Sequence, residues 1–283
     1  MVIHYPGPLH HAASTPACSM DLPPELALGT LTIVRDLARE VGERMVALAG
    51  SLRSASAKGG VDVVTEADRY SEQALCSALA RHFPTHRIAG EEGTRLGPAD
   101  SPWTWHIDPL DGTANYARGI PYWSLSLGLA HHHRPVLGVV HGPLCGITVS
   151  GGAGLGAWSG DQPLPAATPA GEERTWIVAT DWPWDLAERQ RSVRLLARLA
   201  PRIRQYKTFG SAALDLANLA LGHLDAYAIP KIFPWDQAAG AAIAAALGYE
   251  LRTWSGAPWD LAHNDIVACR PGMWPVLEMA TAG

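Results

Sequence analysis

The segment WHIDPLDGTANY, residues 105–116, places two aspartates, Asp108 and Asp111, three positions apart across a turn that contains Pro109. A turn of this kind can aim both carboxylates at one point. Converging carboxylates repel each other, and the usual remedies are a shared proton or a bound cation. Hard oxygen ligands favour Mg2+, Mn2+ or Ca2+ over Zn2+. The segment therefore predicts a cation site at the end of a strand.

The residues that follow Asp111 predict an anion site beside this cation site. Gly112 lets the backbone come close to a ligand, and Thr113 comes next. If a helix begins here, its free N–H groups and the positive end of its dipole face the same point. Carboxylates for a cation then adjoin backbone donors for an anion, which is what a metal-bridged phosphate needs.

Three further carboxylates lie outward from this segment, at predicted strand ends or helix starts. Asp68 closes VDVVTEAD (61–68), Glu91 lies in GEE (90–92) and Asp236 lies in PWDQAAG (234–240). Each short motif alone is typical of a solvated turn, a surface loop or a helix N-cap. Together they indicate a common site, because strand ends and the loops after them present reactive groups on a rigid scaffold.

With these motifs the chain resembles the inositol monophosphatase family, which also includes phosphatases of histidinol phosphate, fructose 1,6-bisphosphate and 3′-phosphoadenosine nucleotides. Weaker matches are GIP (119–121), GAWSGDQPL (156–164) and FGSAALDLANLALGHLDAY (209–227). The resemblance runs from about residue 22 to the C-terminus. It implies a layered αβαβα sandwich of the inositol monophosphatase and fructose-1,6-bisphosphatase type, and a Mg2+-dependent phosphatase that acts on a small polar metabolite.

The resemblance also implies a set of metal ligands for two or three Mg2+ ions. Glu91, Asp108 and the backbone carbonyl of Leu110 would hold the first ion. Asp108, Asp111 and Asp236 would hold the second, and a weaker third ion would also use Glu91. The metal site would thus bring together residues that lie far apart in the sequence, from Glu91 to Asp236.

Catalytic and phosphate-binding roles are implied in the same way. Gly112 and Thr113 would bind the phosphate through backbone N–H groups, and Asp68 would hydrogen-bond Thr113 and orient it. Glu91 and Thr113 would hold the attacking water in line with the phosphorus. Positioning and electrostatics dominate phosphoryl transfer, so no covalent intermediate is required.

The substrate itself stays open, because the chain departs from the family pattern. Inositol-specific members carry an acidic residue seven positions before the W-D aspartate, where it contacts the inositol hydroxyls; here that position is Ile229. Lys231 either reads a second anionic group or is a solvated lysine, and Ser211 and Ala212 are further candidate substrate contacts. Histidinol phosphate and 3′-phosphoadenosine nucleotides are alternative substrates, and a non-catalytic binding protein on the same fold is a remote alternative.

Composition bounds the class of protein. The chain has 283 residues, with 47% apolar and 17% charged residues, a net charge of −5 and a pI of about 6.2. This balance predicts a folded protein that does not bind nucleic acid. The four cysteines are scattered, which favours a reducing compartment, and we expect a cytoplasmic protein. No apolar run reaches the roughly 18–20 residues that span a bilayer, and no signal peptide is recognisable.

We expect a flexible tail at 1–21, an N-terminal half at 22–150 that carries most metal ligands and a C-terminal half at 151–283, with the site between the halves. By resemblance the protein is a homodimer. A loop is expected at 51–60 and carries Lys58. The predicted helices cover 22–52, 68–82, 186–199, 211–221 and 236–247. The predicted strands cover 61–65, 87–90, 103–107, 125–130, 136–141, 146–150, 177–180, 226–229 and 265–268.

Two other patterns indicate hairpins. Residues 152–157 fit a G-x-G-x-x-A string, but Trp158, Pro163 and Pro165 follow, so no helix of a dinucleotide-binding unit can start well there. Three histidines at 131–133 suggest a metal site, yet consecutive strand residues point to opposite faces. A hairpin loop and a solvated hairpin end are therefore predicted.

Overall fold

The computed structural model describes residues 24–48, 55–58 and 62–282, and describes side chains at 27–47 and 67–282. The tail predicted at 1–21 lies outside these residues. No described helix combines the length and apolarity needed to cross a membrane.

The larger sheet has eight strands, and its central strands are buried on both faces. Both faces must therefore be covered by other elements. All neighbouring strands run antiparallel except β3 and β5, which are parallel. The strand order is β10 (Gln162–Pro163), β9 (Gly156–Ser159), β8 (Ile147–Gly152), β7 (Arg134–Gly142), β6 (Ser124–His131), β5 (Trp103–Asp111), β3 (Arg87–Gly90) and β4 (Arg95–Leu96).

The smaller sheet has five strands, and its first three run parallel to one another. A separate antiparallel pair joins β1 (Ala55–Lys58) to β2 (Asp62–Thr65). The order in the smaller sheet is β12 (Gln205–Lys207), β11 (Ile177–Ala179), β13 (Ala226–Ile229), β15 (Ile266–Cys269) and β14 (Glu250–Arg252).

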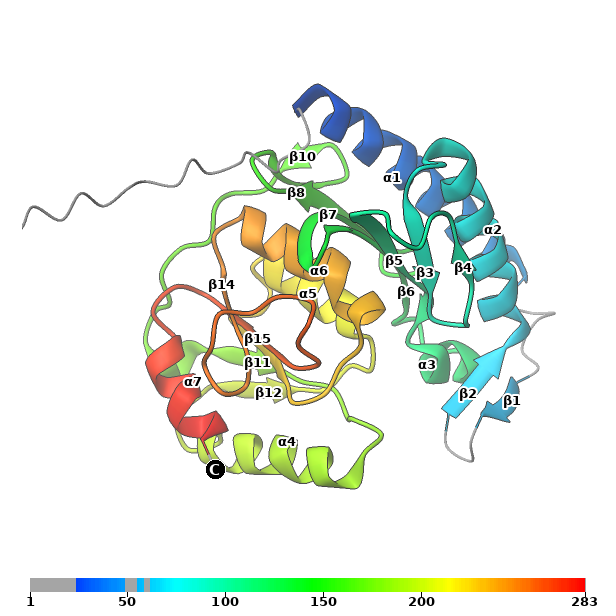
Figure 1. The fold of residues 1–283 in the computed structure, drawn as a ribbon. Coiled ribbons are helices and arrows are strands. Elements are labelled where there is room, and N and C mark those ends of the chain that lie inside the picture. Colours follow the sequence, from blue (N-terminus) through cyan, green and yellow to red (C-terminus); the bar gives the residue numbers. More distant parts are fainter. Residues whose placement is uncertain (1–23, 49–54, 59–61, 283) are drawn as a thin grey trace, which may run out of the picture.

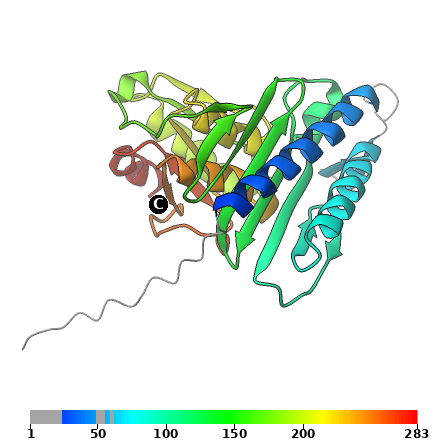
Figure 2. The ribbon, with the colours of Figure 1, turned by 90° about the horizontal axis from the view of Figure 1, so that it is seen from above.

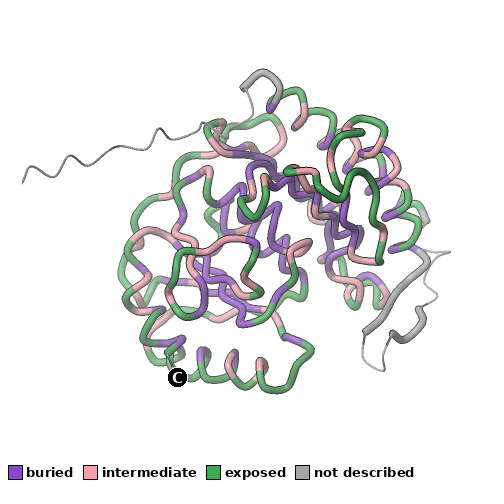
Figure 3. The backbone as a smooth tube through the Cα atoms, viewed as in Figure 1, coloured by how far each residue is buried: buried purple, intermediate pink, exposed green. Residues whose placement is uncertain are grey.

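Helices complete five layers around the two sheets (Figure 1). Helices α1 (Pro24–Leu48) and α2 (Glu66–His82) lie side by side across the outer face of the larger sheet (Figure 2). Between the sheets lie α5 (Ala212–Ala220) and α6 (Pro234–Ala246), and most of their residues are buried (Figure 3). Helices α4 (Leu186–Leu199) and α7 (Trp274–Thr281) cover the smaller sheet. The predicted αβαβα sandwich is confirmed.

The central helix α6 lies very close to the larger sheet. Its sequence, PWDQAAGAAIAAA, consists largely of small residues. A Cβ atom at Gly138 of β7 would lie 2.2 Å from the carbonyl oxygen of Ala239, and one at Gly128 of β6 would lie 2.6 Å from the Ala239 nitrogen. Glycine in the strands and alanine in the helix therefore set the distance between these layers.

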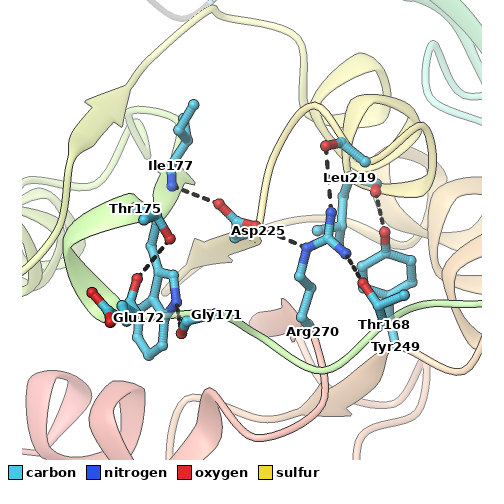
Figure 4. A network of polar contacts seen from close by, with 11 residues as sticks. Thr168, Gly171, Glu172, Thr175, Ile177, Leu219, Asp225, Tyr249 and Arg270 are labelled. Carbon is cyan, nitrogen blue, oxygen red and sulfur yellow. Dashed lines mark hydrogen bonds and ion pairs between the residues drawn. The ribbon is translucent and has the colours of Figure 1, made fainter.

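A charged network braces the start of the smaller sheet (Figure 4). Asp225 precedes β13 and accepts a hydrogen bond from the backbone N–H of Ile177, at the start of β11, at 2.8 Å. Its other oxygen accepts from Nε of Arg270, just after β15, also at 2.8 Å. Arg270 also donates to the hydroxyl of Thr168. One carboxylate thus joins three neighbouring strands.

All fourteen predicted elements overlap an observed helix or strand, and the ends differ by a few residues. The loop predicted at 51–60 was wrong at 55–58, where β1 pairs with β2 and includes Lys58. Both hairpin predictions are confirmed: Gly152 pairs with Gly156 across the turn between β8 and β9, and His132 and His133 are exposed between β6 and β7. Short elements missed by the sequence patterns include α3 (Thr113–Arg118), η1 (Glu173–Thr175), β4, β10, β12, β14 and α7.

Candidate functional site

A β-bulge brings Asp108 and Asp111 to the same face of β5. Asp108 pairs with Ser126 of β6, whereas Asp111 pairs with Ser124, so β5 advances three residues where β6 advances two. In a regular strand, residues three apart point to opposite faces, and the extra residue cancels this difference. The backbone N–H of Leu110 donates to Asp108 at 2.9 Å and stabilises the turn.

Glu91 joins Asp108 because β3 and β5 are parallel neighbours that end together. Gly90 pairs with Ile107, and the backbone N–H of Glu91 donates to the carbonyl of Ile107 at 3.0 Å. Glu91 is therefore level with Asp108 at the adjacent strand end. This is the arrangement by which parallel strands place side chains at one edge of a sheet.

Asp236 comes from α6, in the layer between the sheets. Its carboxylate accepts a hydrogen bond from the backbone N–H of Phe233 at 3.0 Å and caps the first turn of the helix. The hydroxyl of Ser126 donates to the carbonyl of Trp235 at 2.9 Å. Because Ser126 is also the strand partner of Asp108, it aligns the start of α6 with the aspartates of β5.

Asp108 is 2% exposed and lines the same cavity as Glu91, Asp111 and Asp236. Its carboxyl group interacts electrostatically with these three groups. Burial, followed by the charge of Glu91, raises the pKa of Asp108 well above its usual value. Burial, followed by Asp236, raises the pKa of Glu91 to about 9, and burial raises the pKa of Asp236 to about 7. Carboxyl groups that converge on one cavity repel each other unless shared protons or cations offset their charge.

Asp111 is held by the start of α5. One oxygen accepts from the Ser211 hydroxyl at 2.5 Å and from the backbone N–H of Ala213 at 2.7 Å, and the other lies 3.3 Å from the backbone N of Ala212. Burial, followed by the charge of Asp236, nevertheless raises the pKa of Asp111 to about 8. Asp111 therefore connects the larger sheet to a helix of the inner layer.

The predicted anion site lies at the start of α3. Gly112 has φ 93°, a left-handed conformation that favours glycine, and no described side chain caps the helix. The hydroxyl of Thr113 lies 3.1 Å from the carboxylate of the buried Asp68 and 3.0 Å from the carbonyl of Leu110. The expected contact between Asp68 and Thr113 is therefore present.

The donor set fits a hard divalent cation. Glu91, Asp108, Asp111 and Asp236 all line the site, and neither a histidine nor a cysteine is among the residues that line it. Over the ranges with described side chains, no three His, Cys, Asp or Glu residues are already spaced as a closed metal cage. Glu91, Asp108, Asp111 and Asp236 could hold Mg2+ or a similar ion.

These residues form the inner end of a pocket of about 440 Å3. Its outer part is lined by residues from the loop after β11, which no sequence motif indicated, and from the loop before α6. Trp182, Trp184 and Phe233 are 54%, 55% and 45% exposed at its rim. Asp181 and Asp185 also line the pocket.

Three of the four predicted substrate contacts line the pocket, and the fourth does not. Ile229, at the end of β13, lines the pocket, and so does Ala212. Lys231 also lines it, with its ammonium 3.8 Å from Asp185 and each of these two side chains 45% exposed. Ser211 is buried and its hydroxyl is directed at Asp111. Contact of these residues with a substrate stays a prediction.

A buried carboxylate in α2 shapes the turn that carries Glu91. Glu72 is 3% exposed and accepts hydrogen bonds from the backbone N–H groups of Glu92 at 2.7 Å and Thr94 at 2.9 Å. A Cβ atom at Gly90 would lie 2.4 Å from a Glu72 oxygen. The turn is therefore wrapped around the Glu72 carboxylate, and Gly90 must be a glycine to allow this.

Comparison with known proteins agrees with this geometry. The family model described as the inositol monophosphatase family matches residues 28–282. The chain is 33% identical over 257 residues to an inositol-1-monophosphatase of Synechocystis sp., covering 89% of this chain and 88% of that protein. It is also 29% identical to the Nus factor SuhB of Vibrio cholerae, covering 88% of this chain and 94% of that protein.

Solved structures show the same fold. The extragenic suppressor protein SuhB of Bartonella henselae superimposes with a TM-score of 0.83 at 26% identity, covering 89% of this chain and 98% of that one. An inositol monophosphatase of Anabaena sp. gives a TM-score of 0.77 at 28% identity, covering 89% and 95%. Fold, motifs and relatives agree, and the chain belongs to the inositol monophosphatase family of phosphoric monoester hydrolases.

Proposed function

We propose that this chain is a Mg2+-dependent phosphatase that hydrolyses a phosphate monoester of a small polar metabolite with an activated water. One observation carries the proposal: the buried Asp108 carboxyl lines one cavity with Glu91, Asp111 and Asp236, directly beside the start of α3. A cluster of this kind is stable at neutral pH when cations replace its protons. The adjoining backbone donors then favour an anion at the same place.

The chain's own residues would hold the ions. Glu91, Asp108 and the carbonyl of Leu110 would bind one, and Asp108, Asp111 and Asp236 another, with a weaker third ion near Glu91. When bound, such ions activate water and neutralise the charge of a phosphate. The bulge in β5 supports this assignment, because it keeps Asp108 and Asp111 on one face.

Phosphate and water would be oriented by the start of α3. The backbone N–H groups of Gly112 and Thr113 would donate to phosphate oxygens. Asp68 would hold the Thr113 hydroxyl, which together with Glu91 would keep the attacking water in line with the phosphorus. Asp68 is buried, so its position is fixed by packing before a substrate arrives.

The proposal includes features beyond the site. The substrate is one of several phosphate monoesters, with inositol phosphates, sugar phosphates, amino-alcohol phosphates and nucleotide phosphates as the candidate classes. We further propose a cytoplasmic homodimer, with an N-terminal half at 22–150 and a C-terminal half at 151–283 meeting at the site. A purely binding role is disfavoured because every predicted carboxylate is present.

Phosphate release from a panel of monoesters, with Mg2+ and with EDTA, tests the proposal. The panel holds inositol 1-phosphate, histidinol phosphate, fructose 1,6-bisphosphate and phosphoadenosine phosphate. Asp111→Asn should lose nearly all Mg2+-dependent release and still unfold cooperatively. Asp161→Asn is the control, since this carboxylate lies in a distant hairpin and is 84% exposed. Equal rates in Asp111→Asn and the parent would contradict the metal assignment.

A further inference from the structure

The outer pocket contains a carboxylate that the proposed mechanism does not use. Asp181 lies two residues beyond the end of β11, and β11 runs parallel to β13 with Ala179 paired to Tyr227. The hydroxyl of Thr180 donates to the carbonyl of Ala228 at 2.6 Å and continues this register past the strand end. Asp181 is therefore level with Ile229 on the adjacent strand, and both line the pocket.

Two uncharged donors fix the Asp181 carboxylate. The backbone N–H of Gly210 donates to one oxygen at 2.9 Å, and the hydroxyl of Tyr227 donates to the other at 3.1 Å. Tyr227 is fully buried, so this support is rigid. An ionised carboxylate has about four acceptor sites, and these two bonds occupy half of them. Asp181 can therefore accept further hydrogen bonds from a molecule in the pocket.

The charges around the pocket leave Asp181 available for a substrate. The inner carboxylates are those assigned to Mg2+, and Lys231 lies 3.8 Å from Asp185, which offsets its charge. Burial raises the pKa of Asp181 only to about 6, so it is ionised at neutral pH. Beside it, Trp182 and Phe233 present half-exposed rings that can pack against a carbon skeleton.

This inference rests on the proposed function. We infer that Asp181 determines substrate specificity by accepting hydrogen bonds from donors on the leaving alcohol. The substrate class is then a phosphate monoester of a polyol or an amino alcohol, whose hydroxyl or ammonium groups face Asp181. A substrate with a second anionic group at this place is excluded, because two anions would be forced together.

The competing explanation is that Asp181 only positions the loop before α5. Its bond to Gly210 lies next to Ser211, which holds Asp111. If that were its whole role, removing its charge would affect every substrate to the same degree. A substrate-specific loss in KM separates the two explanations.

The test compares Asp181→Asn with the parent at saturating Mg2+. The substrates are inositol 1-phosphate, ethanolamine phosphate, fructose 1,6-bisphosphate and phenyl phosphate, whose leaving group carries no further donor. We expect kcat/KM for the better of the two donor-bearing substrates to fall about ten- to a hundredfold, mainly through KM, with phenyl phosphate changed less than about twofold. The inositol and ethanolamine arms show whether hydroxyl or ammonium is read.

Two further variants sharpen the test. Tyr227→Phe removes one donor to Asp181 and should shift KM in the same direction by a smaller factor. Asp161→Asn makes the same chemical change in a distant hairpin, where the carboxylate is 84% exposed, so both substrate types should be unaffected. Thermal unfolding of each variant confirms that it is folded.

Each other outcome overturns the inference. Equal losses for phenyl phosphate and the donor-bearing substrates would assign Asp181 to loop positioning alone. A parent that prefers fructose 1,6-bisphosphate would contradict the substrate class. A parent that hydrolyses phosphate esters while Asp181→Asn leaves every KM unchanged would refute the inference and keep the proposed function. A parent that hydrolyses none would refute both.

Discussion

Replacing Glu72 by glutamine tests how the turn that carries Glu91 is held. The carboxylate accepts two backbone hydrogen bonds from that turn, and it is buried. A hydrogen bond to a charged group contributes about 1.5–3 kcal/mol. Glutamine keeps one acceptor and turns an NH2 group towards the other N–H, so we expect a loss of about 2–3 kcal/mol. At about 2–4 °C per kcal/mol for a large domain, the midpoint of unfolding should fall by roughly 4–12 °C.

The same change should weaken Mg2+ binding, because Glu91 would no longer be held against Asp108. Mutation of a residue that orients a metal ligand typically lowers metal affinity about 10- to 100-fold, and we expect a loss at the lower end of that range. Thermal unfolding in EDTA measures the first effect, and calorimetric titration with Mg2+ measures the second. Glu92→Gln removes the same charge from the turn itself and serves as the control. A Glu72→Gln variant with a lower midpoint but unchanged Mg2+ affinity would refute the positioning role.

Three other outcomes are expected. In EDTA the midpoint of thermal unfolding should fall as the pH rises from 3.8 towards about 8, because the folded state keeps the Asp111 proton that the unfolded state releases. Saturating Mg2+ should reduce this dependence of the midpoint on pH. A midpoint that rises with pH in EDTA would contradict the prediction. Gly138→Ala should cost about 1–3 kcal/mol in denaturant unfolding, because its Cβ would collide with the Ala239 carbonyl, whereas Gly29→Ala, in open space on α1, should be neutral or stabilising. Asp225→Asn should lower stability by about 1–3 kcal/mol through the ion pair of Figure 4 and leave Mg2+ affinity unchanged; a changed affinity would show that this network reaches the site.

The sequence motifs predicted the inner site because its residues lie in short contiguous segments. The spacing of Asp108 and Asp111 was a correct guide to convergence, but its physical cause could not be read from the residues. A regular strand would have separated the two carboxylates, and only the register against β6 shows the bulge that brings them together. Glu72 belongs to a helix whose pattern indicated nothing beyond burial.

The outer pocket could not be predicted because it depends on strand pairing between distant segments. Asp181 follows a three-residue strand and has no motif of its own, and its place beside Ile229 results from the parallel register of β11 and β13. The strands missed by the sequence patterns are short or at sheet edges, where alternation is too brief to recognise. The layer order was predictable from the family resemblance, and the helix positions were predictable from the sequence pattern.

The close fit of α6 against the larger sheet has a consequence for folding kinetics. Asp236 belongs to α6, so it can join Asp108 only once this helix has packed against the larger sheet. Such long-range closure is slow, and a partly folded chain would hold the acidic cluster of β5 without its final ligand. Tight Mg2+ binding would therefore appear only once α6 has docked, and the ion would act as a reporter of that docking step.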